Sequence, residues 1–261
     1  MALYDTIGRT YDTTRKADPD ITRCLARLLN LRPGARYLDV GCGSGNYTVA
    51  LQQLGARMFG VELTDTMLAK ARAKHSSVSW IQGDAESIPV ADGTFDGAIA
   101  TVTIHHWPRL RPGFDEVFRV MKSGRFVLFT GDHAQLNGYW LREYFPRGIE
   151  AAIKQMPSAE YVTEQLKLAG FDDVATEPWD VPHDIQDWFL YAGKYAPEIY
   201  LDPGVRAGIS FFAHETICSA EETDSGCAQL KVDIGSGRIN DVMAKYRHDL
   251  GDYLFVIATK S

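Results

Sequence analysis

The chain has 261 residues, 45% of them hydrophobic, which is enough to bury a full core. Its net charge of -7 argues against a broad phosphate-binding surface, so we expect no nucleic-acid partner. No run approaches the roughly eighteen apolar residues of a membrane span, and residues 1–20 contain no signal-peptide core. We therefore expect no membrane partner and a cytoplasmic location.

The four cysteines are widely separated and form no CxxC pair. No cluster of histidine and cysteine has the spacing of a zinc site. The pattern predicts free thiols, as in a reducing compartment, and no metal site.

Strands and helices alternate through the first half of the chain. A helix is expected over 20–30 and stops at Pro33-Gly34. Apolar runs predict strands at 35–41, 57–63, 78–85, 95–104 and 125–130. Helical patterns at 46–56, 64–75 and 111–124 lie between them, the second of these capped by Thr64 or Asp65. This alternation predicts an α/β fold with a parallel, doubly wound sheet covered on both faces.

The regular alternation of strands and helices ends after residue 132. A capped helix at 158–171, a strand at 173–181 and a last strand at 252–260 are predicted. Between them, residues 134–156 and 183–250 look irregular and are rich in aromatic side chains. We expect one domain over 1–261, with cap helices within 1–30 and two insertions, 134–156 and 183–250, that form a lid over the active end.

Three glycines, Gly41, Gly43 and Gly45, separate the first of these strands from its helix. Glycine permits a tight turn and lets a ligand approach the main chain. Ligands of such sheets bind at the carboxyl ends of the strands, where this turn must lie. The spacing is G-x-G-x-G, because Asn46 stands at the last glycine of the dinucleotide fingerprint. Asp39 precedes the turn and would repel a pyrophosphate, whereas a ligand with an ammonium group would tolerate it.

Two further carboxylates, Glu62 and Asp84, follow the next two strands. An acid at the position of Glu62 accepts hydrogen bonds from ribose hydroxyls in such folds, and Asp84 is placed to meet the amine of adenine. Together with Asp39, they indicate a ligand with an amino-acid end, a ribose and an adenine but no phosphate. We therefore expect the ligand to be S-adenosylmethionine, which has these parts.

With these residues the chain resembles the class I, Rossmann-like methyltransferases, in the group that contains the ubiquinone/menaquinone methyltransferases. The matching segments are "LDVGCGSGNYT", "GVELTDTML", "GDAESIPVADGTFDGAI", "TIHHW" and "FRVMKSGRFVLF". The resemblance implies a mostly parallel seven-stranded sheet whose last strand is antiparallel. This chain has "MKSGRF" where relatives usually have a Pro-Gly-Gly turn.

The resemblance also implies which residues hold the cofactor. Asp39 and the three glycines would border its methionine part, and Glu62 would hold the ribose. Leu63 and Met67 would contact the adenosine, Asp84 and Ala85 the adenine, and the Thr101 carbonyl the methionine amine. The N-terminal segment often closes over the cofactor in such enzymes, which makes candidates of Tyr4, Tyr11 and Arg15.

Methyl transfer requires a positioned acceptor and exclusion of water more than it requires a base. His106 and His105, after the fourth strand, are candidate bases, and His133 is another. The predicted pocket walls are Trp107, Tyr139, Trp140 and Tyr144. No Asn/Asp-Pro-Pro-Tyr-type segment follows the fourth strand, which by family analogy disfavours nucleic-acid bases and favours a small organic acceptor.

Other functions remain open at this point. The same cofactor site would serve transfer or cyclisation of the aminocarboxypropyl group, with release of methylthioadenosine. A module that binds the cofactor without turnover is a third possibility. A nicotinamide oxidoreductase is disfavoured by Asn46 and Asp39.

Overall fold

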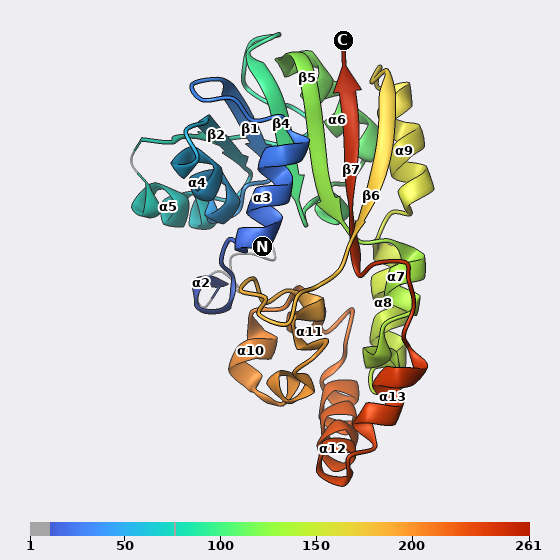
Figure 1. The fold of residues 1–261 in the computed structure, drawn as a ribbon. Helices are drawn as coiled ribbons and strands as arrows, with labels where there is room; N and C mark the ends of the chain where they lie inside the picture. The colour runs from blue at the N-terminus through green and yellow to red at the C-terminus, as the bar shows by residue number, and fades with distance from the viewer. Residues whose placement is uncertain (1–10, 76) are drawn as a thin grey trace.

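The computed structural model describes residues 11–75 and 77–261. A seven-stranded sheet in the order β3-β2-β1-β4-β5-β7-β6 forms its centre (Figure 1). The strands are β1 (Arg36–Val40), β2 (Arg57–Glu62), β3 (Ser79–Gln82), β4 (Phe95–Thr101), β5 (Met121–Thr130), β6 (Asp173–Trp179) and β7 (Tyr253–Lys260). β7 runs antiparallel to β5 and β6, whereas the other pairs are parallel. The predicted sheet is confirmed.

Helices cover both faces of the sheet, because successive strand residues point to opposite sides. Leu38 and Phe126 belong to one core cluster, with side chains of α6 and α9. Their neighbours Tyr37 and Val127 belong to the other, with side chains of α3 and α4. The flanking helices are α3 (Pro19–Leu28), α4 (Asn46–Gln53), α5 (Asp65–Lys74), α6 (Leu110–Val120) and α9 (Ala159–Leu168).

The boundary between α6 and β5 differs from the prediction, which placed a helix within 111–124 and began the strand at residue 125. The strand begins at Met121, which pairs with Phe95, and the register shifts before Arg125 pairs with Gly97. Gly124 lies at this irregularity with φ +100°, and a Cβ there would be 2.3 Å from the Asp96 carbonyl oxygen. Residues 121–124 therefore belong to the strand and not to the helix. The helical spacing of apolar residues does not show where the pairing with β4 begins.

The two insertions are largely helical rather than irregular. The first contains α7 (His133–Asn137), η2 (Trp140–Glu143) and α8 (Pro146–Gln155). The second contains η3 (Leu190–Gly193), η4 (Pro197–Leu201), α10 (Pro203–Ala207), α11 (Ser210–Ala213), α12 (Ala220–Ser236) and α13 (Ile239–Lys245). They lie together beyond the end of β5 and β6 (Figure 1). Two short elements complete the description: η1 (Ile104–His106) follows β4, and α2 (Tyr11–Thr14) precedes α3.

Buried acids join the two insertions to each other. Glu222 of α12 is 4% exposed and accepts hydrogen bonds from the backbone N–H groups of Arg147 and Gly148 at the start of α8. Asp233, also buried, accepts one from the Tyr144 hydroxyl at 2.9 Å. The insertions therefore form one body, which we call the lid (residues 134–156 and 183–250).

All four cysteines are free thiols, as predicted. In the part of the chain that the structure describes, no helix is long and apolar enough to cross a membrane.

Phe129 joins the sheet to the lid, and its removal should destabilise both. Its ring is 1% exposed and lies 4.8–6.0 Å from the rings of Phe255, Tyr253, Trp179 and Phe189. We predict that Phe129→Ala lowers the free energy of unfolding by about 3–5 kcal/mol, measured by urea denaturation. The control Leu54→Ala, at a half-exposed helix end, should change it by less than about 0.5 kcal/mol. Equal effects would contradict this role.

Candidate functional site

The glycine turn after β1 combines close packing with an open side. Gly41 has φ +72°, and a Cβ there would lie 2.3 Å from the Thr103 hydroxyl oxygen. Gly43 has φ +55° and nothing within 4 Å of its Cβ position. Both backbone conformations favour glycine. The space at Gly43 is therefore available to a ligand that lies against the main chain.

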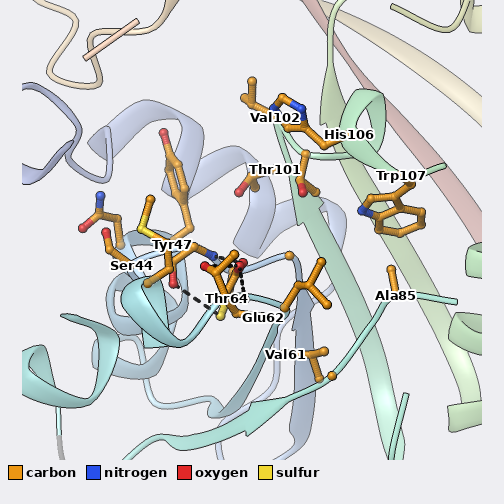
Figure 2. A pocket seen from close by; sticks show the side chains of 18 of the residues that line it. Ser44, Tyr47, Val61, Glu62, Thr64, Ala85, Thr101, Val102, His106 and Trp107 are labelled. Atoms are coloured by element: carbon orange, nitrogen blue, oxygen red, sulfur yellow. Dashed lines mark hydrogen bonds between the residues drawn. The ribbon is translucent and has the colours of Figure 1, made fainter. Parts of the chain in front are cut away.

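A cavity of about 310 Å³ adjoins this turn at the carboxyl ends of the parallel strands (Figure 2). Its volume falls in the range of small-molecule sites, roughly 300–1,000 Å³. The sequence-predicted residues that line it are Arg15, Gly41, Gly43, Glu62, Leu63, Met67, Asp84, Ala85, Thr101, His106 and Trp107. The structure thus brings together residues from separate strand ends.

Glu62 is held rigidly at the end of β2. Its side chain is 8% exposed. One carboxylate oxygen accepts a hydrogen bond from the Gly43 N–H at 3.1 Å. The other accepts from the Thr64 N–H at 3.0 Å and the Thr64 hydroxyl at 2.9 Å (Figure 2). Thr64 precedes α5 as predicted, but its hydroxyl binds Glu62 and makes no cap bond. The carboxylate is therefore fixed before any ligand arrives.

Asp39 is 1% exposed and lies behind the turn; neither it nor Gly45 lines the cavity. One carboxylate oxygen accepts a hydrogen bond from the Thr48 hydroxyl at 2.6 Å. The other is buried without a partner among the described residues. Burial is the main cause that raises the pKa of Asp39 to about 7, and the nearby Glu62 charge adds to it. A cationic group or a water that reaches this oxygen would be stabilised.

Asp84 and the residues beside it form the other end of the cavity. Asp84 is exposed and follows β3, and its carboxylate accepts a hydrogen bond from the Glu86 N–H at 2.9 Å. Among the described residues that line the cavity, Arg15 is the one lysine or arginine, against the carboxylates of Glu62, Asp84 and Asp187. The acidic lining suits a cationic ligand and disfavours a pyrophosphate.

An ion pair that the sequence analysis missed closes the cavity on the lid side. Arg15 Nε lies 2.5 Å from a carboxylate oxygen of Asp187, which is 172 positions away in the chain. The Tyr47 hydroxyl donates to the other oxygen of Asp187 at 3.0 Å. The Asn46 side chain donates to the Arg15 carbonyl oxygen at 3.1 Å. No local motif marks Asp187, because its partners come from distant segments.

Two further candidates, Tyr4 and Tyr11, have no described side chain. Tyr4 lies outside the described residues. Tyr11 begins α2, but its side chain is not among those described.

A smaller cavity of about 70 Å³ lies beneath the lid. Arg15 and Val102 line both cavities, so these residues mark the place where the two meet. Val102 follows β4 with φ +48°, a strained conformation for a β-branched residue. Its N–H donates to the Phe129 carbonyl oxygen at 2.8 Å, which holds it there. Strain of this kind occurs preferentially at functional sites.

The adjacent histidines face different cavities. His106 lines the larger one and His105 the smaller one, and their ring centroids are 4.0 Å apart. Burial lowers the pKa of His106 to about 4 and that of His105 well below its usual value. Both rings are therefore neutral at neutral pH. His133 lines neither cavity, and its Nε2 lies 2.5 Å from the Met156 carbonyl oxygen.

Three of the four aromatic residues expected in the pocket walls lie elsewhere. Tyr139, Trp140 and Tyr144 are buried inside the lid and line neither cavity. Their polar atoms are occupied there; the Tyr139 hydroxyl, for example, lies 2.7 Å from that of Tyr200. Trp107 does line the larger cavity, opposite Glu62 (Figure 2). Within residues 11–75 and 77–261, no group of three or more His, Cys, Asp or Glu side chains is arranged to hold a metal ion.

Comparisons with known proteins agree with this geometry. Residues 38–129 match the family described as "Methyltransferase domain". A solved structure from Anabaena variabilis, described as a methyltransferase from an antibiotic biosynthesis pathway, is 33% identical with a TM-score of 0.85. The match covers 94% of this chain and 99% of that one.

Two curated relatives are more distant. The malonyl-[acyl-carrier protein] O-methyltransferase of Pectobacterium atrosepticum is 27% identical over 57% of this chain, and the match spans 64% of that protein. The demethylmenaquinone methyltransferase of Beutenbergia cavernae is 24% identical over 63% of this chain and 74% of that protein.

The chain belongs to the class I S-adenosylmethionine-dependent methyltransferases, enzymes whose cofactor is S-adenosylmethionine. The residues present fit that cofactor. The unpartnered oxygen of Asp39, the open side of Gly43 and the acidic lining all suit a cationic adenosine without phosphate.

The raised pKa of Asp39 makes cofactor affinity depend on pH. Asp39 is mostly protonated at about pH 6 and mostly ionised at about pH 8, because its folded pKa is about 7. An ammonium group favours the ionised form. We predict that affinity for S-adenosylhomocysteine, measured by calorimetry, rises about tenfold across this interval. Asp39→Asn should abolish the rise, and an unchanged slope in that variant would contradict the assignment.

Removal of Glu62 should weaken cofactor binding. Glu62→Ala leaves the Gly43 and Thr64 N–H groups without their acceptor and removes the carboxylate that we expect to bind the ribose hydroxyls. We predict a loss of more than about 1 kcal/mol in S-adenosylhomocysteine binding, at least about fivefold in Kd. The control is Asp65→Ala, an exposed acid that does not line the cavity. Equal affinities of both variants and the parent would refute the prediction.

Proposed function

We propose that this protein transfers the methyl group of S-adenosylmethionine to a small organic acceptor held beneath the lid. The supporting observation is the arrangement of two cavities that meet at Arg15 and Val102. The larger has the chemistry of the cofactor, and the smaller is enclosed by residues of both insertions. The acceptor atom is an oxygen, nitrogen or carbon nucleophile.

In this proposal the whole chain, 1–261, acts as one domain. Glu62 accepts hydrogen bonds from the ribose, Asp84 and Ala85 bind the adenine, and the Thr101 carbonyl accepts one from the methionine amine. Leu63 and Met67 supply apolar contact, and the three glycines give room for the chain of the ligand. Of the segment 1–30, the described residues 11–30 close over the ligands together with the two insertions. The smaller cavity, rather than Tyr139, Trp140 and Tyr144, receives the acceptor.

When bound, S-adenosylmethionine supplies a methyl group on a positively charged sulfur. The protein orients the acceptor and excludes water, and correct placement alone supplies on the order of 7–11 kcal/mol. A general base adds about 3–5 kcal/mol. His105 and His106 suit this role without placing another positive charge beside the sulfur, because both are neutral. Arg15 is already paired with Asp187.

The relatives' names span different acceptors. One names a malonyl-[acyl-carrier protein] and another a demethylmenaquinone. Because acceptors differ so widely within the family, the choice depends on the lid of this chain. The acidic balance of the chain disfavours a nucleic-acid acceptor.

The products formed from the cofactor distinguish methyl transfer from its alternatives. We expect no methylthioadenosine when the protein is incubated with S-adenosylmethionine alone. With a panel of hydroxylated, amino and enolisable small molecules, we expect S-adenosylhomocysteine in equal amount to labelled methyl product, measured by mass spectrometry. Methylthioadenosine formed without an acceptor would instead indicate aminocarboxypropyl chemistry or cyclisation. Binding without either product across the panel would indicate a module that does not turn over its ligand.

A further inference from the structure

We propose that the cavity of about 70 Å³ is an acceptor subsite that selects an uncharged, largely apolar molecule with a hydroxyl or neutral amine facing His105. This inference rests on the proposed methyl transfer and specifies the class of its acceptor.

The walls of the smaller cavity are mainly apolar and come from both insertions. Six of its side chains are Leu136, Met156, Phe189, Ile209, Phe211 and Ile217. They belong to α7, α11 and the loops around them, which gather beyond the ends of the strands (Figure 1). Transfer of apolar surface into such walls stabilises a complex by roughly 25 cal/mol per Å². The body of the acceptor is therefore apolar.

The charged residues of this cavity are already neutralised by protein partners. Arg15 binds both carboxylate oxygens of Asp187, with nitrogen–oxygen distances of 2.5 and 3.2 Å. Asp252 is 2% exposed and accepts hydrogen bonds from the Lys194 ammonium at 2.5 Å and the Val181 N–H at 2.8 Å. A charged acceptor would have to break one of these pairs or remain unpaired, and a buried unpaired charge costs several kcal/mol. This balance excludes carboxylates, phosphates and ammonium groups.

A ring nitrogen of His105 is available for hydrogen bonding in the same cavity. Its Nδ1 is buried and has no partner among the described residues. An unsatisfied buried polar atom costs about 1–3 kcal/mol. The ring is neutral, so Nδ1 either accepts or donates depending on the tautomer. A hydroxyl satisfies both cases because it is a donor and an acceptor.

The reaction at a hydroxyl acceptor balances with His105 as the proton acceptor. The acceptor oxygen forms a bond to the methyl carbon, and the carbon–sulfur bond breaks with its electron pair on sulfur. The hydroxyl proton moves to His105 Nδ1. The methylated oxygen carries a positive charge and is strongly acidic until it loses this proton. A neutral imidazole of low basicity therefore suffices.

The size of the cavity limits what enters it in this conformation. A volume of about 70 Å³ is well below the roughly 300–1,000 Å³ of typical small-molecule sites. The reacting end of an acceptor fits, and a ring requires adjustment of the walls. Met156 is a flexible side chain suited to such adjustment. Small aromatic probes therefore require the walls to adjust by the smallest amount that admits a ring.

Matched probes test the charge selection without turnover. The protein is saturated with S-adenosylhomocysteine, and phenol, benzoate and benzylamine are titrated by ligand-observed saturation-transfer NMR. We expect phenol to bind, with benzoate and benzylamine weaker by about tenfold or more. Failure of phenol to bind, or equal binding of benzoate or benzylamine, overturns the proposal.

Two variants on one helix test the location. Ala152 of α8 lines the cavity, whereas its neighbour Ala151 does not. Ala152→Leu should weaken phenol binding about tenfold with unchanged affinity for S-adenosylhomocysteine, and Ala151→Leu should change neither. Equal effects of the two variants on phenol overturn the assignment.

His105→Leu separates hydrogen bonding from packing and remains informative if Ala152→Leu fails to fold. The variant should weaken phenol about tenfold but leave toluene binding unchanged. Equal loss of phenol and toluene would assign His105 a packing role and overturn the proposal. Failure of S-adenosylhomocysteine itself to bind the parent protein would instead contradict the proposed function, which keeps the two tests distinct.

Discussion

The ion pair between Arg15 and Asp187 is the contact on which the arrangement of the site depends. It joins the N-terminal segment to the lid across 172 positions of sequence, and the Tyr47 hydroxyl connects it to α4. Nearby, the Trp188 N–H donates to the Thr14 carbonyl oxygen at 3.0 Å. Arg15 also lines both cavities, so the junction lies where the two meet. One partly buried ion pair therefore connects the N-terminal segment, α4 and the lid at the place where the two cavities meet.

The sheet and its ligand end were predictable because local patterns determine them. Apolar strands alternate with helices, and the turn at Gly41 and the carboxylates at Glu62 and Asp84 follow strand ends in the sequence itself. The helices of the lid were not predictable in this way. α12 buries Glu222 and Asp233, which bind partners in the first insertion, so it has no clean apolar stripe. The tertiary contacts of such a helix override its periodicity.

The candidate site likewise combines residues that local sequence patterns predict with residues that only the fold brings together. Residues of the cofactor cavity lie next to motifs that sequence reasoning recognises, whereas Asp187 and Val102 gain their roles only from long-range contacts. The aromatic side chains of the lid gave a misleading signal. Tyr139, Trp140 and Tyr144 are conspicuous in sequence, yet their rings and polar atoms fill the lid interior. Composition reports that a segment is aromatic, but it does not report which way the rings face.

The left-handed backbone at Val102 has a further consequence for how such an enzyme diversifies. The partition between the larger and the smaller cavity, which we propose to hold donor and acceptor, is built partly from main chain, anchored to β5 by a hydrogen bond to the Phe129 carbonyl oxygen. The part of this partition at Val102 is then set by the sheet, whereas Arg15 contributes a side chain to it. In the proposed function, substitutions in the lid would change which molecule is admitted and leave the main chain at Val102 in place. In this proposal, the choice of acceptor and the geometry of methyl transfer thus depend on different parts of the chain.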